Sequence, residues 1–148
     1  MAEDDDRLSV LPPTPAPDNR PHVYVLNSDP DFLEMIGELL HDARVHVTLE
    51  QLRPNLQVSL DNLRSARPDL LILDVVPYQS NSAAFLDYLE ADSELARLPV
   101  LVASTSAHAA EALAGEHPDL VRDVLPKPFD LDAFYATLSK LVVGIVVP

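Results

Sequence analysis

The sequence predicts an α/β fold in which five parallel strands form one sheet with helices on both of its faces. Short apolar segments alternate along the chain with longer segments whose apolar residues recur every three to four positions. The connections are too long for hairpins, so consecutive strands are expected to run parallel with helical crossovers. The central segment, residues 70–73, is four consecutive apolar residues, as expected of a strand covered on both faces.

The first half of the chain contains three predicted strands and two predicted helices. Residues 22–26 form the first strand, after which Asp29 and Pro30 supply a helix cap and a first-turn proline. The apolar positions of that helix are Phe32, Met35 or Ile36, and Leu39 or Leu40. The elements that follow are a strand at 45–49, a helix at 55–66 with Leu56, Leu60 and Leu63 on one face, and the central strand.

The second half of the chain continues the same alternation. Its elements are a helix at 83–91, a strand at 99–103, a helix at 107–114 that Gly115 stops, a strand at 121–125, and a last helix capped by Asp130. The last helix carries apolar residues at Leu131, Phe134, Leu138, Leu141 and Val142. For five such units the favoured arrangement is a flavodoxin-like, doubly wound (βα)5 sheet with strand order 2-1-3-4-5.

Two segments of different composition divide the chain. Residues 1–21 combine an acidic run at 3–6 with prolines at 12, 13, 15, 17 and 21, and this composition predicts a disordered tail. Residues 22–148 form one predicted domain, and no effector domain is expected after it. The apolar stretch at 141–148 is expected either to pack back on the sheet or first helix, or to support a homodimer through the last helix.

The charge and composition argue against several functions. A formal net charge of −14 disfavours nucleic acid and anionic membranes as partners, because both require clustered lysine and arginine. No apolar run approaches the ~20 residues of a membrane span. The absence of cysteine excludes disulfides and thiolate metal sites, and the five histidines lack the spacing of metal ligands. A cytoplasmic location is the expectation.

Polar residues follow the predicted strands at the points where the strands end. Asp74 ends the central strand, Asn27 and Ser28 end the first, Ser104 ends the fourth, and Lys127 follows the fifth. The carboxyl ends of parallel strands lie at one edge of a sheet, which is where ligands bind in this type of fold. The sequence therefore predicts a functional site at that edge.

Residues 22–142 resemble the receiver domain of response regulators in two-component signalling. The matching motifs are Asp74 after Leu-Leu-Ile-Leu, Ser104 after Pro-Val-Leu-Val-Ala, and Lys127 within Leu-Pro-Lys-Pro-Phe-Asp. The resemblance implies that Asp74 is the phosphoacceptor, Ser104 the switch hydroxyl, and Lys127 the lysine that pairs with the acceptor and then the phosphate. It also implies a cis peptide bond between Lys127 and Pro128.

The resemblance further implies the partners of the chain. A histidine kinase or a phosphotransfer protein would supply the phosphoryl group. A downstream protein would bind the face formed by the helix at 107–114, the strand at 121–125 and the last helix.

The expected magnesium site is incomplete. In the family, two adjacent acidic residues after the first strand hold Mg²⁺ together with the phosphoacceptor, but Asn27 and Ser28 occupy those positions here. Mg²⁺ prefers charged oxygen ligands, so Asp74 alone predicts weak or absent binding. Asp29, one residue further on, is an alternative ligand, although it is better placed as a helix cap.

Other positions also depart from the family pattern. Pro77 follows Asp74 by three residues instead of four, Ser82 replaces a glycine, and Val124 replaces an aromatic residue that reports the switch. The helix that ends at Gly115 leaves a longer loop at 116–120. Together these changes predict a receiver that does not run the usual magnesium-dependent cycle efficiently.

Three functions remain open from the sequence. The first is a stand-alone receiver in a phosphorelay, with Asp74 at the phosphoacceptor position and a weakened magnesium site. The second is a phosphorylation-independent pseudo-receiver that acts as a protein-interaction adaptor. The third, an aspartate-nucleophile phosphatase, needs an acid at the position of Val76 and is the least favoured, so the chain is not expected to be an enzyme.

Overall fold

The computed structural model describes residues 20–75 and 81–148, in which five strands alternate with five helices. The strands are β2 (His22–Asn27), β3 (His46–Gln51), β4 (Leu70–Asp74), β5 (Val100–Ser104) and β6 (Val121–Pro126). The helices are α2 (Pro30–Asp42), α3 (Leu56–Ala66), α4 (Asn81–Ala91), α5 (Ala107–Glu116) and α6 (Leu131–Leu141). Most of the predicted tail, and the predictions made for Val76 and Pro77, lie outside the described residues.

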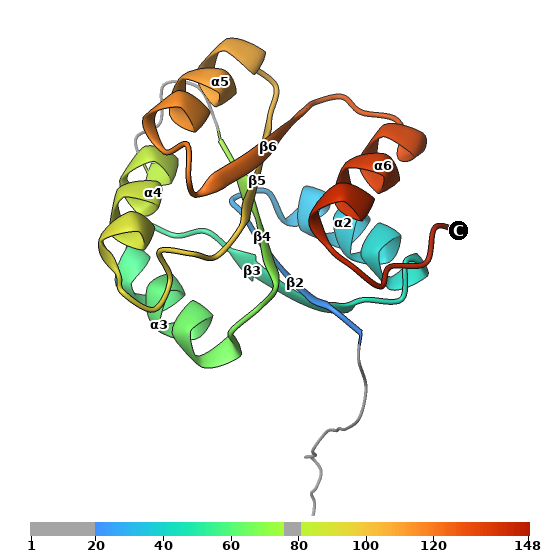
Figure 1. Cartoon of the computed structure of the whole chain (residues 1–148), viewed down its shortest axis with the longest axis horizontal. Helices are drawn as coiled ribbons and strands as arrows, with labels where there is room; N and C mark the ends of the chain where they lie inside the picture. Colours follow the sequence, from blue (N-terminus) through green and yellow to red (C-terminus); the bar gives the residue numbers. More distant parts are fainter. Residues whose placement is uncertain (1–19, 76–80) are drawn as a thin grey trace, which may run out of the picture.

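The strands form one parallel sheet in the order β3-β2-β4-β5-β6. Counted along the chain this is the order 2-1-3-4-5, so the predicted flavodoxin-like arrangement is confirmed. Helices α2 and α6 cover one face of the sheet, and α3, α4 and α5 cover the other (Figure 1). The strand order places the carboxyl ends of β2, β4 and β5 side by side.

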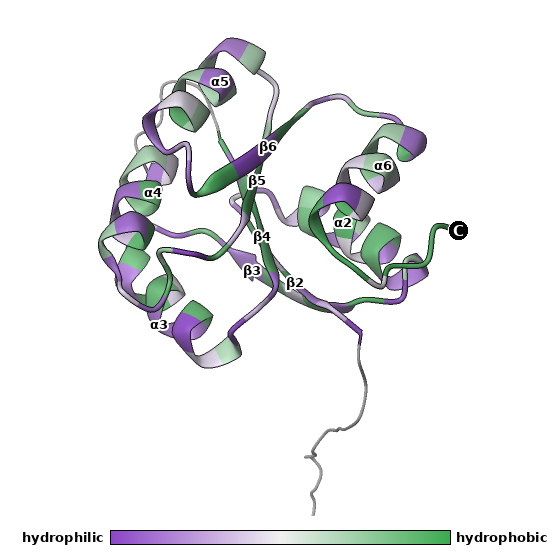
Figure 2. Cartoon of the chain, in the orientation of Figure 1, coloured by the Kyte–Doolittle hydropathy of each residue, from purple (hydrophilic) through white to green (hydrophobic). Residues whose placement is uncertain are grey.

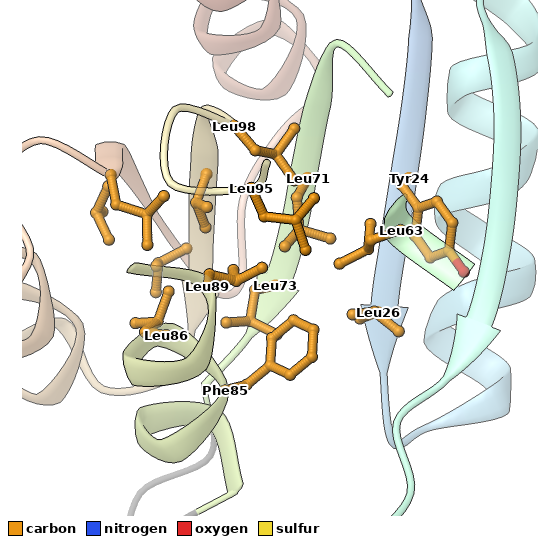
Figure 3. Packing of buried hydrophobic residues seen from close by; sticks show 14 of the residues in the cluster. Tyr24, Leu26, Leu63, Leu71, Leu73, Phe85, Leu86, Leu89, Leu95 and Leu98 are labelled. Carbon is orange, nitrogen blue, oxygen red and sulfur yellow. The ribbon is translucent and has the colours of Figure 1, made fainter. Parts of the chain in front are cut away.

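The central strand β4 is buried along its whole length, as its apolar sequence predicts. Leu71 and Leu73 belong to the core under α3, α4 and α5, where Phe85 of α4 lies close to Leu73 (Figure 3). Leu70 and Ile72 belong to the second core under α2 and α6. Apolar residues accordingly dominate β4 and β5, with no polar face on either strand (Figure 2).

The helices begin at the predicted capping residues. The carboxylate of Asp29 accepts the amide N–H of Asp31 at 3.0 Å, with Pro30 as the first residue of α2. The carboxylate of Asp130 accepts the amide N–H of Ala133 at 2.6 Å at the start of α6. The described helices have 10 to 13 residues, and none is long and apolar enough to cross a membrane.

The prediction that Gly115 stops the helix at 107–114 is wrong. Helix α5 continues through Gly115 to Glu116, and the amide N–H of His117 still bonds the carbonyl of Leu113 at 3.1 Å. A glycine inside a helix costs about 1 kcal/mol but does not forbid the helix. The end is set instead by His117, which is 3% exposed and anchors the turn in the protein.

Two apolar positions that were candidates for the core face solvent. Met35 is 43% exposed while the neighbouring Ile36 is fully buried. Leu131 is 54% exposed, and Tyr135 is buried on the same helix. A period of three to four residues leaves the rotation of a helix uncertain by about one residue, and packing against the sheet decides it.

The apolar stretch at the end of the chain packs back onto α2, as one of the two expectations held. Val142 is buried, Ile145 packs against the core under α2 and α6, and the amide N–H of Val146 bonds the carbonyl of Ala43 at 3.0 Å. Val143 remains 93% exposed. The segment is therefore part of the domain, with single valines left at its surface.

Candidate functional site

Asp74 ends the central strand at the predicted edge of the sheet. Its side chain is 7% exposed, and its backbone carbonyl accepts the hydroxyl of Ser82 at 2.7 Å. A carboxylate this deeply placed requires a counter-ion or hydrogen-bond donors, because burying an isolated charge is costly.

Lys127 supplies that counter-ion. Its ammonium group forms an ion pair and hydrogen bond with Oδ1 of Asp74, although the two residues are 53 positions apart. The backbone N–H of Lys127 donates to the carbonyl of Ser104 at 2.8 Å, and the Lys127–Pro128 peptide bond is cis, as the resemblance implied. The ammonium also lies 4.1 Å from the centroid of the Phe32 ring, a cation–π contact.

Ser104 lies at the same edge but is engaged with the backbone. Its hydroxyl donates to the carbonyl of Val75 at 2.8 Å and accepts the amide N–H of Ser106 at 3.1 Å. The side chain is fully buried. Strand-end hydroxyls commonly bond the backbone in this way, so the switch role of Ser104 stays a prediction.

Asn27 ends the neighbouring strand β2, with only 1% of its surface exposed. Its side-chain oxygen Oδ1 accepts the amide N–H of Asp29 at 2.7 Å, which fixes the orientation of the amide group. The nitrogen Nδ2 is then a buried donor with no hydrogen-bond partner among the described residues. Ser28 is exposed, and its carbonyl accepts Nε2 of Gln51 at 3.2 Å.

These residues do not fit a magnesium ion. Asp74 is already paired with Lys127, Asn27 has its oxygen occupied and presents a donor, and Asp29 caps α2. Mg²⁺ needs oxygen ligands in near-octahedral geometry, usually including one or two free carboxylates. Over residues 20–75 and 81–148, no group of three or more acidic, histidine or cysteine side chains is arranged to hold a metal.

Glu50, a further acid near this edge, was not predicted and is occupied. Its carboxylate accepts the hydroxyl of Tyr24, the hydroxyl of Ser59 at 2.6 Å and the amide of Asn62 at 3.1 Å. The pKa of Tyr24 is raised, mainly because the hydroxyl is buried and secondly because it donates a hydrogen bond to Glu50. This cluster joins β2, β3 and α3, and leaves Glu50 unable to replace the missing acids.

Sequence reasoning also missed Phe32 and Ser82 as neighbours of the pair. Phe32 was predicted as a core residue of the first helix, but it is half-buried and lies beside the ammonium of Lys127. Ser82 was noted only as a departure from glycine, yet its hydroxyl holds the backbone of Asp74. No local pattern marks these contacts, since each joins separate elements.

His117, one of the five histidines without metal-ligand spacing, has a structural role. Its ring nitrogens lie 3.2 Å from Oδ1 of Asp87 and 3.3 Å from Oε2 of Glu90, so it links the end of α5 to α4. The two carboxylates approach opposite sides of the ring and therefore cannot share one metal ion with it.

The fold is that of receiver domains. No family model matches the chain, and no curated protein matches it. Among solved structures it is similar to the chemotaxis response regulator CheY4 of Vibrio cholerae, with 21% identity, 84% of this chain and all of the other covered, and a TM-score of 0.69. It is also similar to a response regulator from Thermotoga maritima, with 20% identity, 84% and 99% coverage, and a TM-score of 0.67. A sensor protein from Polaromonas sp. gives 20% identity, 82% and 95% coverage, and a TM-score of 0.70.

Proposed function

We propose that this chain is a receiver-type module of two-component signalling that acts through protein contacts without an efficient magnesium-dependent phosphorylation cycle. The observation that carries this proposal is the buried amide nitrogen of Asn27, which presents a donor where an acidic residue would bind metal. A phosphoryl group arriving at Asp74 would then lack the cation that neutralises its oxygens in the transition state.

Conventional phosphorylation of Asp74 is the second candidate. The ion pair between Asp74 and Lys127 and the cis bond before Pro128 favour it, because they reproduce the geometry that the resemblance implies. In that case a histidine kinase or a phosphotransfer protein would be the donor, and Ser104 would turn toward the phosphoryl group.

The two candidates differ in their response to acetyl phosphate and magnesium. We expect little or no gain of a phosphoryl group by the wild-type chain in intact-mass measurements. The double variant Asn27→Asp/Ser28→Asp restores the acidic pair, and the carboxylate introduced at the first position would still accept the amide N–H that Oδ1 of Asn27 accepts. We expect this variant to gain magnesium-dependent labelling.

The control is Asp74→Asn in the background of the double variant, which must abolish the labelling. Rapid, stoichiometric labelling of the wild-type chain at Asp74 would contradict the proposal and favour the conventional cycle. Failure of the double variant to gain labelling would show that the acidic pair is not what limits the site.

The downstream partner is proposed to bind the face of α5, β6 and α6. The exposed side chain of Leu131 at the start of α6 supplies an apolar contact on that face. Val124 on β6 stands where the family carries the aromatic switch residue, so this face would not depend on an aromatic rotation. Binding to Leu131→Ser, compared with wild type, tests the assignment once a partner is isolated.

A homodimer through the end of the chain is a further proposal. Val143, Val146 and Val147 are 93%, 46% and 59% exposed on the segment that follows α6. Removing the segment would also remove the buried Val142, so the sharper test is Val143→Ser/Val147→Ser in sedimentation experiments. An unchanged oligomeric state would remove the support for this dimer.

A further inference from the structure

The amino-terminal edge of the sheet, opposite Asp74, carries two adjoining hollows lined by arginine. The first has a volume of about 460 Å³ and is lined by Arg64, Arg67 and Arg97, together with the acids Asp69 and Glu94, over an apolar floor that includes Leu98. The second, of about 560 Å³, shares Arg97 and adds Arg122. We call these four arginines the arginine edge. The whole chain has ten lysine and arginine residues and a net charge of −14, so this concentration of positive charge is unusual within it.

Three of the four guanidinium groups are incompletely neutralised. Arg67 is 82% exposed, with a carboxylate oxygen of Glu94 no closer than 3.9 Å. The exposed Arg97 makes no ion pair or hydrogen bond within the described part of the chain. Arg122 donates to the backbone carbonyl of Asp119 at 3.3 Å, which leaves its charge unpaired.

Arg64 differs from the other three because it is held by acids of the domain. Its guanidinium lies 2.6 Å from Oδ1 of Asp61 and 2.5 Å from Oδ2 of Asp92. The hydrogen bond from Arg64 lowers the pKa of the Asp92 carboxyl group. Arg64 therefore forms a fixed wall of the hollow, while the other three remain available to an anion.

His22, near the start of the described residues, contacts one residue that lines the first hollow. Asp69 lines the first hollow, and its carboxylate accepts the backbone N–H of His22 at 2.8 Å. The carbonyl of Pro21 accepts the N–H of His46 at 2.9 Å, so the chain is anchored up to Pro21. The described chain therefore begins one contact away from the first hollow, through Asp69, while Arg20 itself lines the groove between α2 and β3.

A third hollow near the same point is lined mainly by acidic residues. The groove between α2 and β3, of about 700 Å³, is lined by Arg20 but also by Glu34, Glu38 and Asp42. These three carboxylates would repel an acidic segment. Charge thus favours the arginine edge, where the linings of the two hollows carry four arginines and three carboxylates, over a groove with one arginine and three carboxylates.

We propose that the acidic run at residues 3–6 of this same chain docks on Arg67, Arg97 and Arg122. The run contributes four consecutive carboxylates, Glu3, Asp4, Asp5 and Asp6. Thirteen residues, 7–19, connect it to Arg20 and can span at most roughly 45 Å, which is enough to cross one edge of a small domain.

Because residues 7–19 tether the acidic run to the domain, even a weak contact is enough to keep it partly bound. A segment joined to its site by a short linker has an effective concentration on the order of millimolar, so a contact with a millimolar dissociation constant is about half occupied. Such a contact would cover the arginine edge for about half of the time.

The absence of cysteine permits a direct test on the full-length chain. A nitroxide label on Ala2→Cys, next to the acidic run, broadens the amide signals of residues that it approaches. At low ionic strength we expect the signals of Arg67, Arg97 and Leu98 to lose most of their intensity, because rapid exchange brings the nitroxide close to these amides for about half of the time. High salt should restore them, because the screening length falls from about 30 Å at 0.01 M to about 3 Å at 1 M.

Two variants and one mixture decide the proposal. Arg67→Gln/Arg97→Gln should abolish the broadening, whereas Arg53→Gln, which removes an exposed arginine after β3 at the opposite edge, should leave it unchanged. Broadening that is absent, that survives in Arg67→Gln/Arg97→Gln, or that centres on the groove between α2 and β3 would overturn the proposal. Equally strong broadening of the signals of nitroxide-free chains that are mixed with separate nitroxide-labelled chains would assign the contact to a second copy and likewise overturn it.

Discussion

The charged side chains at the two edges of the sheet differ in how far they are buried and neutralised. At the carboxyl edge, Asp74 and Lys127 are 7% and 17% exposed and neutralise each other. At the amino edge, Arg67 is 82% exposed, and Arg97 has no ionic partner within the described residues. The first arrangement is closed, because both charges are satisfied inside the protein, and the second is open to an anion from outside.

This difference distinguishes the edge that resembles the site of receiver domains from the edge that carries exposed, incompletely neutralised arginines. The carboxyl edge holds Asp74 and Lys127 as an internal ion pair. The amino edge is not part of that arrangement, yet it carries the charges that remain free. The predictions that follow compare the two edges, from the largest expected effect to the smallest.

Lys127→Met should give the largest loss of stability. The substitution keeps an apolar stem and leaves the carboxylate of Asp74 without a counter-ion in a nearly buried position. Removing one partner of a buried pair costs about 3–5 kcal/mol, and the partial exposure of Lys127 reduces our expectation to about 2–3 kcal/mol. Urea unfolding at neutral pH measures the change.

The matched control for this variant is Lys140→Met. Lys140 is 66% exposed and lies 3.0 Å from Oδ2 of Asp123, so its loss should cost no more than about 0.5 kcal/mol. The variant Asp74→Asn/Lys127→Met should recover most of the stability lost in Lys127→Met. Equal effects of Lys127→Met and Lys140→Met would show that the carboxyl edge is not a closed pair.

Arg64→Gln should give an intermediate effect that depends on pH. The hydrogen bond from Arg64 lowers the pKa of Asp92 in the folded state, so its contribution to stability is present above the unfolded pKa of about 3.9 and is lost as pH falls through the folded value. The urea midpoint of Arg64→Gln should therefore fall below that of wild type at pH 7 and approach it below about pH 4.

Arg67→Gln is the comparison at the same edge. Since Glu94 is 3.9 Å away and both side chains are exposed, the unfolding midpoint should match that of wild type at both pH values. A pH-independent loss in Arg64→Gln would mean that the arginine stabilises by packing and not through Asp92.

Phe32→Leu should have the smallest effect. The variant removes the ring beside the Lys127 ammonium but keeps apolar volume in the first turn of α2. A cation–π contact of this exposure contributes about 0.5–1 kcal/mol. The same substitution made together with Lys127→Met should add nothing from this contact, and a double-mutant cycle in urea measures the coupling. Full additivity of the two substitutions would contradict a contact between Phe32 and Lys127.

Several features of the site follow from residue type and position alone. Asp74 follows an apolar run, and Asp29 and Asp130 precede amphipathic segments, so the strand end and both caps could be predicted from local chemistry. The end of α5 at Glu116 was not predicted, because no local pattern shows that His117 meets acids of another helix.

The sequence by itself determined the alternation of strands and helices, the parallel sheet, its strand order and the edge at which Asp74 and Lys127 meet. These depend on apolar periodicity and connection length, which are local properties of the chain. The tertiary structure alone decided that the oxygen of Asn27 is occupied, that Phe32 contacts Lys127, and that Asp69 joins the start of β2 to the hollow lined by Arg67 and Arg97. These features depend on how separate elements pack and on which donors reach which acceptors, and no spacing along the sequence encodes that.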